Sequence, residues 1–337
     1  MITVLITSFN YARFIEQAID SVLSQNFCLD EVQILVVDDG STDDTSERVK
    51  KYGSRIEYFY KPNGGQASAL NFGFTKARGE IIALLDADDV FLPGKLFRVV
   101  ETFQNNPTVG MVYHSLEEWH TQTDKRFKWN FPLISGNFRA EPDKFFSYYP
   151  HPTSCISFRR SSLNRLLPIP ERITMLADAY LTHLIPFLSP ILAIPESLTL
   201  YRIHGDNQGI TIMPTNRQMP LETRISRLQK WRILIDATQK WLADNGYTKK
   251  QPGVPSFLGR WTLFLDTQQF LLNSPGRLRF FLHLMAYIHC YGPYMSQRLR
   301  IINCVNAFGS LFTGYEHFYL LDKWRTQLSD KWRVRAK

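Results

Sequence analysis

Three aspartates follow directly on an apolar run and form the strongest candidate for chemistry in this chain. The segment Leu85-Asp86-Ala87-Asp88-Asp89 closes a strand that the apolar pattern predicts over Glu80–Leu85. Two carboxylates one residue apart can share a hard divalent cation, and diphosphate oxygens can complete its coordination. Without a cation, neighbouring carboxylates would repel one another. We therefore predict a site for Mg²⁺ or Mn²⁺; the alternative is loop acids that cap a helix beginning at Pro93.

A second acidic segment, Asp38-Asp39-Gly40-Ser41, follows the apolar run Val32–Val37. A carboxylate at such a strand end can accept a hydrogen bond from a ribose hydroxyl or a base N–H. The alternative is a turn followed by a helix cap, for which glycine, serine and aspartate are suited. Both functions can coexist at this position.

Strand and helix patterns alternate over the first ninety residues and must position these acids. We expect strands at Thr3–Ser8, Val32–Val37, Ile56–Tyr60 and Glu80–Leu85. We expect helices after an Asn10 cap, from a Thr42 or Asp43 cap to about Tyr52, at Gln66–Ala77, and from Pro93 to about Gln104. Strands that are apolar on both faces and separated by helices predict a parallel sheet covered on both sides. Ligands bind outside the carboxyl ends of such strands, so both acidic segments should line one crevice.

The later part of the chain is less regular. Strands are expected at Val109–His114, Thr153–Phe158 and Ile191–Arg202, with an aromatic-rich insertion between the first two. The helix predicted over Leu176–Leu188 is apolar apart from Asp178 and a few other polar residues. An aspartate is costly to bury without a role, which makes Asp178 a candidate functional residue. The alternative is a polar residue on an otherwise buried helix.

Two common nucleotide-binding motifs are missing from the sequence. No Gly-x-Gly-x-x-Gly follows the first predicted strand, and no Gly-x-x-x-x-Gly-Lys-Ser/Thr occurs anywhere. A dinucleotide-dependent oxidoreductase and a P-loop NTPase are therefore not supported.

The motifs together resemble the family 2 glycosyltransferases of the GT-A fold. The resemblance is carried by Thr7-Ser8-Phe9-Asn10-Tyr11, Val37–Asp43, Asn63-Gly64-Gly65, and Leu85–Asp89 with Pro93. Their order and spacing also match, over roughly residues 1–210. The resemblance implies an α/β fold with a Rossmann-like, mostly parallel sheet flanked by helices. It further implies inverting transfer of a sugar from a nucleotide diphosphate donor, which we expect to be a UDP-sugar.

The resemblance also implies roles for individual residues. The donor would be bound by Thr7, Ser8, Phe9, Asn10, Asp38, Asp39, Lys61, Asp86 and Ala87. Within this set, Thr7, Phe9 and Asp38 would hold the nucleoside. The cation, Mg²⁺ or Mn²⁺, would be bound by Asp86, Asp88 and His204, with Asp88 as the main ligand.

Family members usually carry a Glu-Asp pair on a helix after the insertion, and its aspartate acts as the catalytic base. The matching segment here is Met175-Leu176-Ala177-Asp178, so Asp178 takes the place of the base and Ala177 replaces the acidic partner. A carboxylate can take the proton that the acceptor hydroxyl loses late in the displacement. One base on the face opposite the departing diphosphate would invert the configuration.

Tyr201-Arg202-Ile203-His204 resembles the closing Tyr-Arg-x-His element of the family. His204 would ligate the metal or touch the diphosphate, or be structural; Arg202 would pair with phosphate or with a core carboxylate. Of the basic residues near the motifs, Lys61, Arg78 and Lys95 could contact phosphate, but a solvated surface position is favoured for Arg78 and Lys95.

Three further segments have open interpretations. Trp119 and Trp129 could stack on sugar faces, and His151-Pro152-Thr153 could border the acceptor pocket; plain packing is the alternative for each. The cysteines, Cys28, Cys155, Cys290 and Cys304, lie far apart, which does not indicate a zinc site, a redox pair or a disulfide framework. We expect them to be small buried residues.

The composition describes a folded protein with an uneven charge. Of the 337 residues, 44% are hydrophobic and 21% charged, and the net charge is +8. Residues 1–220 hold 21 Lys and Arg against 24 Asp and Glu, whereas residues 221–337 hold 18 against 7. We expect a catalytic domain over residues 1–215 and a helical, basic, aromatic-rich region over residues 216–337, with helices at Leu221–Asn245, Phe257–Leu272, Arg277–Tyr291 and Gln297–Phe312.

Two interpretations of the basic region stay open. It could contact an anionic membrane surface through residues 257–337, which would suit a lipid-linked acceptor, or it could be a helical subdomain packed on the core. We expect a saccharide or lipid-linked acceptor and no nucleic-acid partner, because no recognised module accompanies the charge. No signal peptide and no run of roughly 18 apolar residues is found, which predicts a cytoplasmic protein, in one interpretation peripheral on the cytoplasmic membrane face.

Two rival functions remain open. A non-catalytic sugar-nucleotide-binding or scaffold protein would be consistent with Ala177. A nucleotidyltransferase would share the sheet and the metal-binding carboxylates, but it would normally carry a glycine-rich phosphate loop after the first strand. The segment Ser8–Arg13 contains no glycine.

Overall fold

A computed structural model describes residues 1–28, 31–129, 133–142, 145, 152–205 and 221–247. The sheet belongs to a compact unit formed by Met1–Ile212 and Ile233–Phe257. The predicted helices at Phe257–Leu272, Arg277–Tyr291 and Gln297–Phe312 lie outside the described residues, as do His151, Cys290 and Cys304. The domain boundaries expected from the sequence stay predictions.

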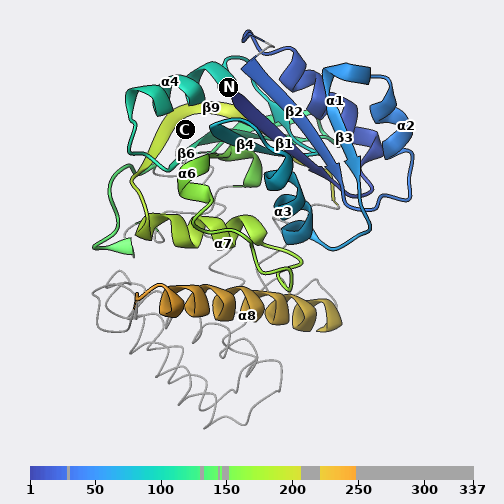
Figure 1. Cartoon of the computed structure of the whole chain (residues 1–337). Coiled ribbons are helices and arrows are strands. Elements are labelled where there is room, and N and C mark those ends of the chain that lie inside the picture. Colours follow the sequence, from blue (N-terminus) through green and yellow to red (C-terminus); the bar gives the residue numbers. More distant parts are fainter. Residues whose placement is uncertain (29–30, 130–132, 143–144, 146–151, 206–220, 248–337) are drawn as a thin grey trace, which may run out of the picture. The chain divides into compact units, whose positions relative to one another are not determined.

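The described strands form one mixed sheet (Figure 1). They are β1 (Ile2–Ser8), β2 (Val32–Asp38), β3 (Glu57–Tyr60), β4 (Ile81–Asp86), β5 (Val90–Phe91), β6 (Met111–His120), β7 (Lys125–Lys128), β8 (Ile156–Arg159) and β9 (Ile191–Ile203). Their order is β3-β2-β1-β4-β8-β6-β9-β5, and β7 pairs with β6.

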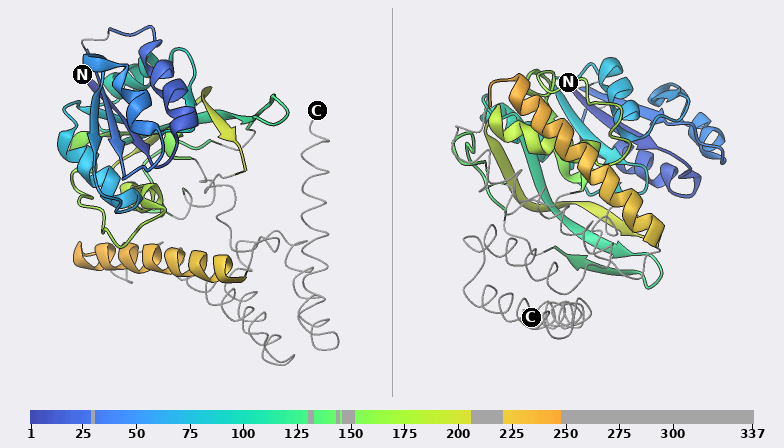
Figure 2. Two further views of the ribbon diagram at one scale, coloured as in Figure 1. Left: turned by 90° about the vertical axis from the view of Figure 1, so that its right-hand side faces the viewer. Right: turned by 90° about the horizontal axis from the view of Figure 1, so that it is seen from below.

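The first four strands along this order are parallel, as the alternating patterns predict. β8 is antiparallel to β4 and to β6, and β5 is antiparallel to β9. The sheet is therefore only partly parallel: among the later strands, β6 and β9 are parallel to each other, while β8, inserted between β4 and β6, runs antiparallel to both of its neighbours. β6 and β7 form a hairpin that extends beyond the rest of the sheet (Figure 2).

Helices cover both faces of the sheet. The cover includes α1 (Ala12–Leu23) and α4 (Lys95–Asn105) on one face and α3 (Gln66–Lys76) on the other. The other described helices are α2 (Thr45–Lys50), α6 (Arg160–Leu163), α7 (Ala177–Leu184) and α8 (Leu221–Asp244). On one face, alternate β1 residues such as Val4 pack with Ile15 of α1 and Val99 of α4 in the main core cluster. On the other face, Leu5 lies against Gly73 of α3, where a Cβ would lie 2.4 Å from the leucine side chain. This contact explains the glycine within a helix.

The prediction that Asn10 caps the first helix is wrong. Asn10 has a φ of 58°, and its side-chain oxygen accepts the N–H of Thr42 at 2.8 Å. Asp43 bonds to the start of α1 instead, since the N–H of Ala12 donates to the Asp43 carboxylate at 2.9 Å. The same carboxylate accepts the N–H of Thr45 at 3.1 Å, at the start of α2. One aspartate therefore accepts N–H groups from the first turns of two helices. Burial alone would raise the pKa of Asp43, but the hydrogen bonds from Thr45 and Ala12 outweigh it and lower the pKa.

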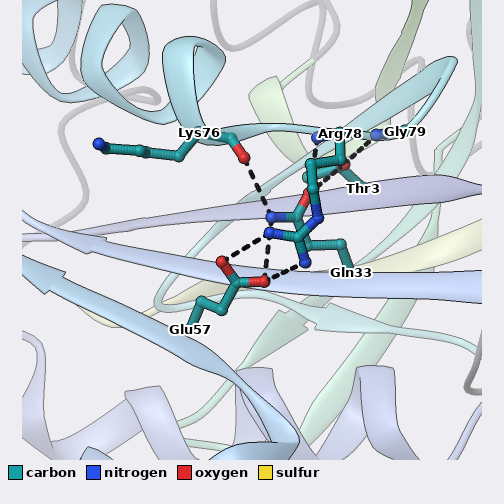
Figure 3. A network of polar contacts seen from close by, with 6 residues as sticks. All are labelled: Thr3, Gln33, Glu57, Lys76, Arg78 and Gly79. Atoms are coloured by element: carbon teal, nitrogen blue, oxygen red, sulfur yellow. Dashed lines mark hydrogen bonds and ion pairs between the residues drawn. The ribbon is translucent and has the colours of Figure 1, made fainter.

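A polar network joins the amino-terminal ends of the first three strands, at the edge opposite the acidic segments (Figure 3). Gln33 accepts the Thr3 hydroxyl at 2.8 Å and donates to Glu57 at 3.1 Å. Arg78 forms a two-pronged ion pair with Glu57 and is 59% exposed. The prediction that Arg78 lies at the solvated surface is thus confirmed.

Candidate functional site

The strand register brings the two acidic segments to the same edge of the sheet. β1 lies between β2 and β4, and Ser8 is aligned with Asp38 while Thr7 is aligned with Asp86. The acids therefore end strands on either side of β1. The two acidic segments therefore share an edge, as expected. The main-chain oxygen of Thr7 accepts the N–H of Ala87 at 3.1 Å, and that of Ser8 accepts the N–H of Asp39 at 2.8 Å. Beyond these contacts, the Phe9 side chain is 42% exposed at the tip of β1.

The carboxylate of Asp38 is fully buried and bonded inside the protein. Oδ1 accepts the N–H of Ser41 at 2.7 Å, and Oδ2 accepts the Tyr58 hydroxyl at 2.8 Å. The Ser41 contact is the turn that the sequence offered as an alternative. Binding of a nucleoside by Asp38 remains a prediction, and it would use lone pairs beyond these two contacts.

Asp39 joins the end of β2 to the loop that precedes α3. Its carboxylate accepts the Lys61 ammonium at 2.6 Å and the N–H groups of Gly64 and Gly65 at 3.0 and 2.7 Å. Gly40 completes this approach, because a Cβ there would lie 2.7 Å from the main-chain nitrogen of Asn63. Asp39 and Lys61, both predicted to bind the donor, are thus partners of each other. They shape the edge of the candidate site.

The second acidic segment has the geometry of a cation site. One carboxylate oxygen from each of Asp86, Asp88 and Asp89 lies within 4.8 Å of the other two. Burial and then the charges of neighbouring carboxylates, that of Asp88 first, raise the pKa of Asp86 and of Asp89 well above the ordinary value. Oδ2 of Asp89 is buried and has no hydrogen-bond partner. A divalent cation fits such a set of oxygens, because it would remove the repulsion and engage an unsatisfied acceptor.

The end of β9 contacts this acidic segment directly. Nε2 of His204 lies 3.0 Å from Oδ2 of Asp88. The main-chain N–H of Arg202 donates to Asp89 at 2.9 Å, and its guanidinium donates to the main-chain oxygen of Asp88. The guanidinium also lies 4.5 Å from the ring centres of Phe14 and Trp119. The described contacts of Arg202 therefore hold the loop of the acidic segment.

The prediction of a solvated Lys95 is wrong. Lys95 is fully buried, and its ammonium donates to the main-chain oxygen of Ser154 and, at 3.1 Å, to the Thr199 hydroxyl. The ammonium lies 3.4 Å from the centre of the Phe91 ring. Burial lowers the pKa of Lys95 to about 7, an effect that the charge of Asp89 opposes. This cation lies beneath the acidic segment, inside the protein.

Asp178 lies in the first turn of α7 and is bonded to the turn that precedes β8. Its carboxylate accepts the Thr153 hydroxyl at 3.0 Å. Burial raises the pKa of Asp178, and the bond from Thr153 and main-chain N–H groups at the start of α7 oppose that rise. The charge of Asp178 in turn contributes to the raised pKa of Asp86. The structure thus brings the predicted base near the predicted metal ligands.

Sequence reasoning named Thr153 only as a residue that could border the acceptor pocket, and it missed the contacts of the 3₁₀ turn Thr153–Cys155, which precedes β8. The turn is buried. The Ser154 hydroxyl accepts the N–H of Asp86 at 3.0 Å, and the Ser154 main-chain oxygen accepts a hydrogen bond from the Lys95 ammonium. Two adjacent hydroxyl residues before a buried strand were the available signal. Tyr11 was also missed as a neighbour of the acids: burial and then the charge of Asp88 raise its pKa.

The remaining predicted residues have packing partners. Trp119 donates to Asp124 at 2.8 Å, and Trp129 packs against a cluster of Leu116, Cys155 and Tyr201. Trp129 therefore shows the packing that was its alternative interpretation, and the Trp119 ring lies against the Arg202 guanidinium; stacking on a sugar stays a prediction for both. Cys155 is buried as expected, but Cys28 is exposed, because it lies in the loop after α1.

Comparison with known sequences assigns the chain to a class of enzymes. A family model described as glycosyl transferase family 2 matches residues 3–167. An uncharacterized glycosyltransferase of Nostoc sp. is 36% identical over 226 residues, which are 62% of this chain and 67% of the relative. An uncharacterized glycosyltransferase of Rickettsia typhi is 41% identical over 96 residues, 28% of this chain and 30% of the relative. The chain is a glycosyltransferase, and it belongs to glycosyltransferase family 2.

Solved structures agree on the fold. TarS of S. aureus, in complex with UDP-GlcNAc, has a TM-score of 0.57 at 16% identity, covering 93% of this chain and 92% of that chain. The mannosyltransferase PcManGT of Pyrobaculum calidifontis, in complex with GDP-Man and Mn²⁺, has a TM-score of 0.51 at 20% identity, covering 98% and 87%. The expected GT-A fold is confirmed. Among the described residues, no helix combines the length and the apolar character needed to span a bilayer.

Proposed function

We propose that this glycosyltransferase inverts the configuration of a sugar that it transfers from a UDP-sugar to an acceptor hydroxyl in polysaccharide or glycoconjugate biosynthesis. One observation carries the proposal. The carboxylate of Asp178 accepts the Thr153 hydroxyl, and the hydroxyl of the next residue, Ser154, accepts the main-chain N–H of Asp86, which belongs to the cluster of three carboxylates. The proposed base and the proposed cation site are therefore joined by one turn.

The donor would lie along the strand tips. Thr7, Phe9 and Asp38 would hold the nucleoside, and the diphosphate would extend towards Asp86 and Asp88. These two carboxylates, with His204 beside Asp88, would hold Mg²⁺ or Mn²⁺. The cation, when bound, neutralises the diphosphate as it departs. PcManGT with GDP-Man and Mn²⁺ supports this arrangement by analogy of fold.

Asp178 would act on the acceptor. As the acceptor oxygen forms its bond to the anomeric carbon and the bond from that carbon to the diphosphate oxygen breaks, the hydroxyl proton passes to the Asp178 carboxylate. Burial raises the pKa of this carboxylate, which brings its basicity closer to the working pH. A single displacement of this kind inverts the anomeric centre.

The proposal extends to the acceptor and to the location of the enzyme. We propose a saccharide or lipid-linked acceptor and a cytoplasmic site of action. Residues 257–337, which could contact a membrane surface according to one interpretation of the sequence, lie outside the described residues.

Thermal stabilisation by nucleotide sugars tests the proposal. The full chain would be heated with UDP-glucose, UDP-GlcNAc, UDP-galactose or GDP-mannose, each with Mn²⁺ and with EDTA. We expect a UDP-sugar with Mn²⁺ to raise the melting temperature and EDTA to abolish the rise, since a ligand at a hundred times its Kd stabilises by about 2.7 kcal/mol. A response to GDP-mannose alone would contradict the UDP donor. No response to any sugar, together with no release of nucleoside diphosphate, would favour the scaffold function.

A further inference from the structure

Asp178 lacks the acidic neighbour that its helix would carry in the usual family pattern. Ala177 precedes it; the methyl side chain of Ala177 cannot form a hydrogen bond, and its main-chain N–H donates to the Gln66 side chain at 2.9 Å. Orientation of the Asp178 carboxylate must therefore come from elsewhere. Besides main-chain N–H groups at the start of α7, the side chain that bonds it belongs to Thr153.

Thr153 is itself firmly placed. It begins the buried 3₁₀ turn Thr153–Cys155, directly after Pro152, and is 5% exposed. The next residue, Ser154, is bonded through its main-chain oxygen to Lys95 and to Thr199, and the Thr199 distance is 2.9 Å. A turn fixed at this point gives its first hydroxyl a fixed position.

The hydroxyl of Thr153 is the donor in its bond to Asp178. An ionised carboxylate accepts but does not donate, so the hydroxyl must be the donor in its 3.0 Å bond to Oδ2 of Asp178. The next hydroxyl of the turn, that of Ser154, accepts the main-chain N–H of Asp86 at 3.0 Å. Adjacent residues of one turn therefore contact the proposed base and a proposed metal ligand.

We propose that Thr153 is a positioning residue for sugar transfer: its hydroxyl holds the Asp178 carboxylate in the orientation that receives the acceptor proton. This inference rests on the proposed role of Asp178 as the base. The hydroxyl gives the proposed base a hydrogen-bond donor at a fixed position, and the turn that carries it also contacts Asp86 through Ser154.

The test compares Thr153→Val, Thr153→Ser and Asp178→Asn in the full chain. The matched control is Thr182→Val, which removes a buried threonine hydroxyl from α7 itself, bonded to the main-chain oxygen of Ala179 at 3.2 Å. Release of nucleoside diphosphate to water is measured with Mn²⁺ and UDP-glucose, UDP-GlcNAc or GDP-mannose, using the sugar that the wild type turns over fastest. Melting temperatures verify that each variant is folded.

We expect Thr153→Val to lower kcat roughly ten- to a hundredfold while the KM for the donor stays within about twofold. Thr153→Ser should restore kcat, and Thr182→Val should behave as the wild type. Wild-type kcat in Thr153→Val, a parallel loss of donor affinity, or a serine variant as slow as the valine variant would overturn the inference. If Asp178→Asn is slow and Thr153→Val is not, only this inference fails. If Asp178→Asn keeps the wild-type rate, the proposed base is wrong.

Discussion

Replacing Asp86 by asparagine should stabilise the metal-free protein. The nearest oxygens of Asp86, Asp88 and Asp89 lie within 4.8 Å of one another. At that distance and an effective dielectric constant of about 20, two unit charges repel by about 3.5 kcal/mol. Proton uptake by the raised-pKa carboxyls relieves part of this repulsion, so we expect a gain of about 1–3 kcal/mol at neutral pH.

The sign of the pH dependence follows from the direction of the pKa shift. Burial and neighbouring charges raise the pKa of Asp86 in the folded state. The stability that the protonated carboxyl contributes is fully present below the ordinary aspartate value, about 3.9, and is lost as the pH rises through the folded-state pKa. The advantage of Asp86→Asn should therefore be absent near pH 4 and grow towards neutral pH.

The assay is thermal unfolding of both proteins with EDTA and with Mn²⁺ plus a UDP-sugar. With EDTA, the variant should melt roughly 3–10 °C above the wild type at neutral pH. With Mn²⁺ and the sugar, the wild type should gain stability and the variant should gain little, because a ligand to the cation has been lost. A metal-free Asp86→Asn protein that is less stable than the wild type at neutral pH would refute the reasoning.

Three further outcomes are expected. Asp39→Asn should destabilise the EDTA-treated protein by about 3–5 kcal/mol in urea unfolding, because the Lys61 ammonium and a glycine N–H lose their acceptor; unchanged stability would contradict this. His204→Gln should raise the Mn²⁺ concentration for half-maximal activity roughly ten- to a hundredfold, since His204 contacts Asp88; an unchanged Mn²⁺ titration would make His204 purely structural. Arg78→Ala should leave nucleotide release unchanged, because its ion pair lies at the opposite edge of the sheet; slowed release would contradict this assignment.

Local sequence patterns predicted most of the strands and helices that position the acidic segments. The apolar runs ending in Asp38 and Asp86 require buried parallel strands, and that arrangement alone places both acids at one edge. The approach of His204 to Asp88 was anticipated only through the family pattern, because 116 residues separate them.

Other features depend on partners that no local pattern reveals. Lys95 opens an amphipathic helix and has the spacing of a surface residue, but Ser154 and Thr199 accept its ammonium from 59 and 104 residues away. Asn10 has the residue type of a helix cap, yet the loop around Thr42 offers its side chain a longer-range bond. The antiparallel strands were also missed, since apolar runs do not encode strand direction.

The start of α3 connects the loop beside Asp39 to the helix that carries Asp178. Gln66 donates its main-chain N–H to Thr174 at 3.0 Å and accepts the N–H of Ala177, while Gly65, just before it, is held by Asp39. Gly65 has a φ of +83°, and a Cβ there would lie 2.8 Å from Thr174. The loop beside the proposed nucleotide site and the helix that carries the proposed base are thus joined by direct hydrogen bonds. A substitution that displaces Asp39 or Gly65 should therefore also displace the start of α7, even when no cation is bound.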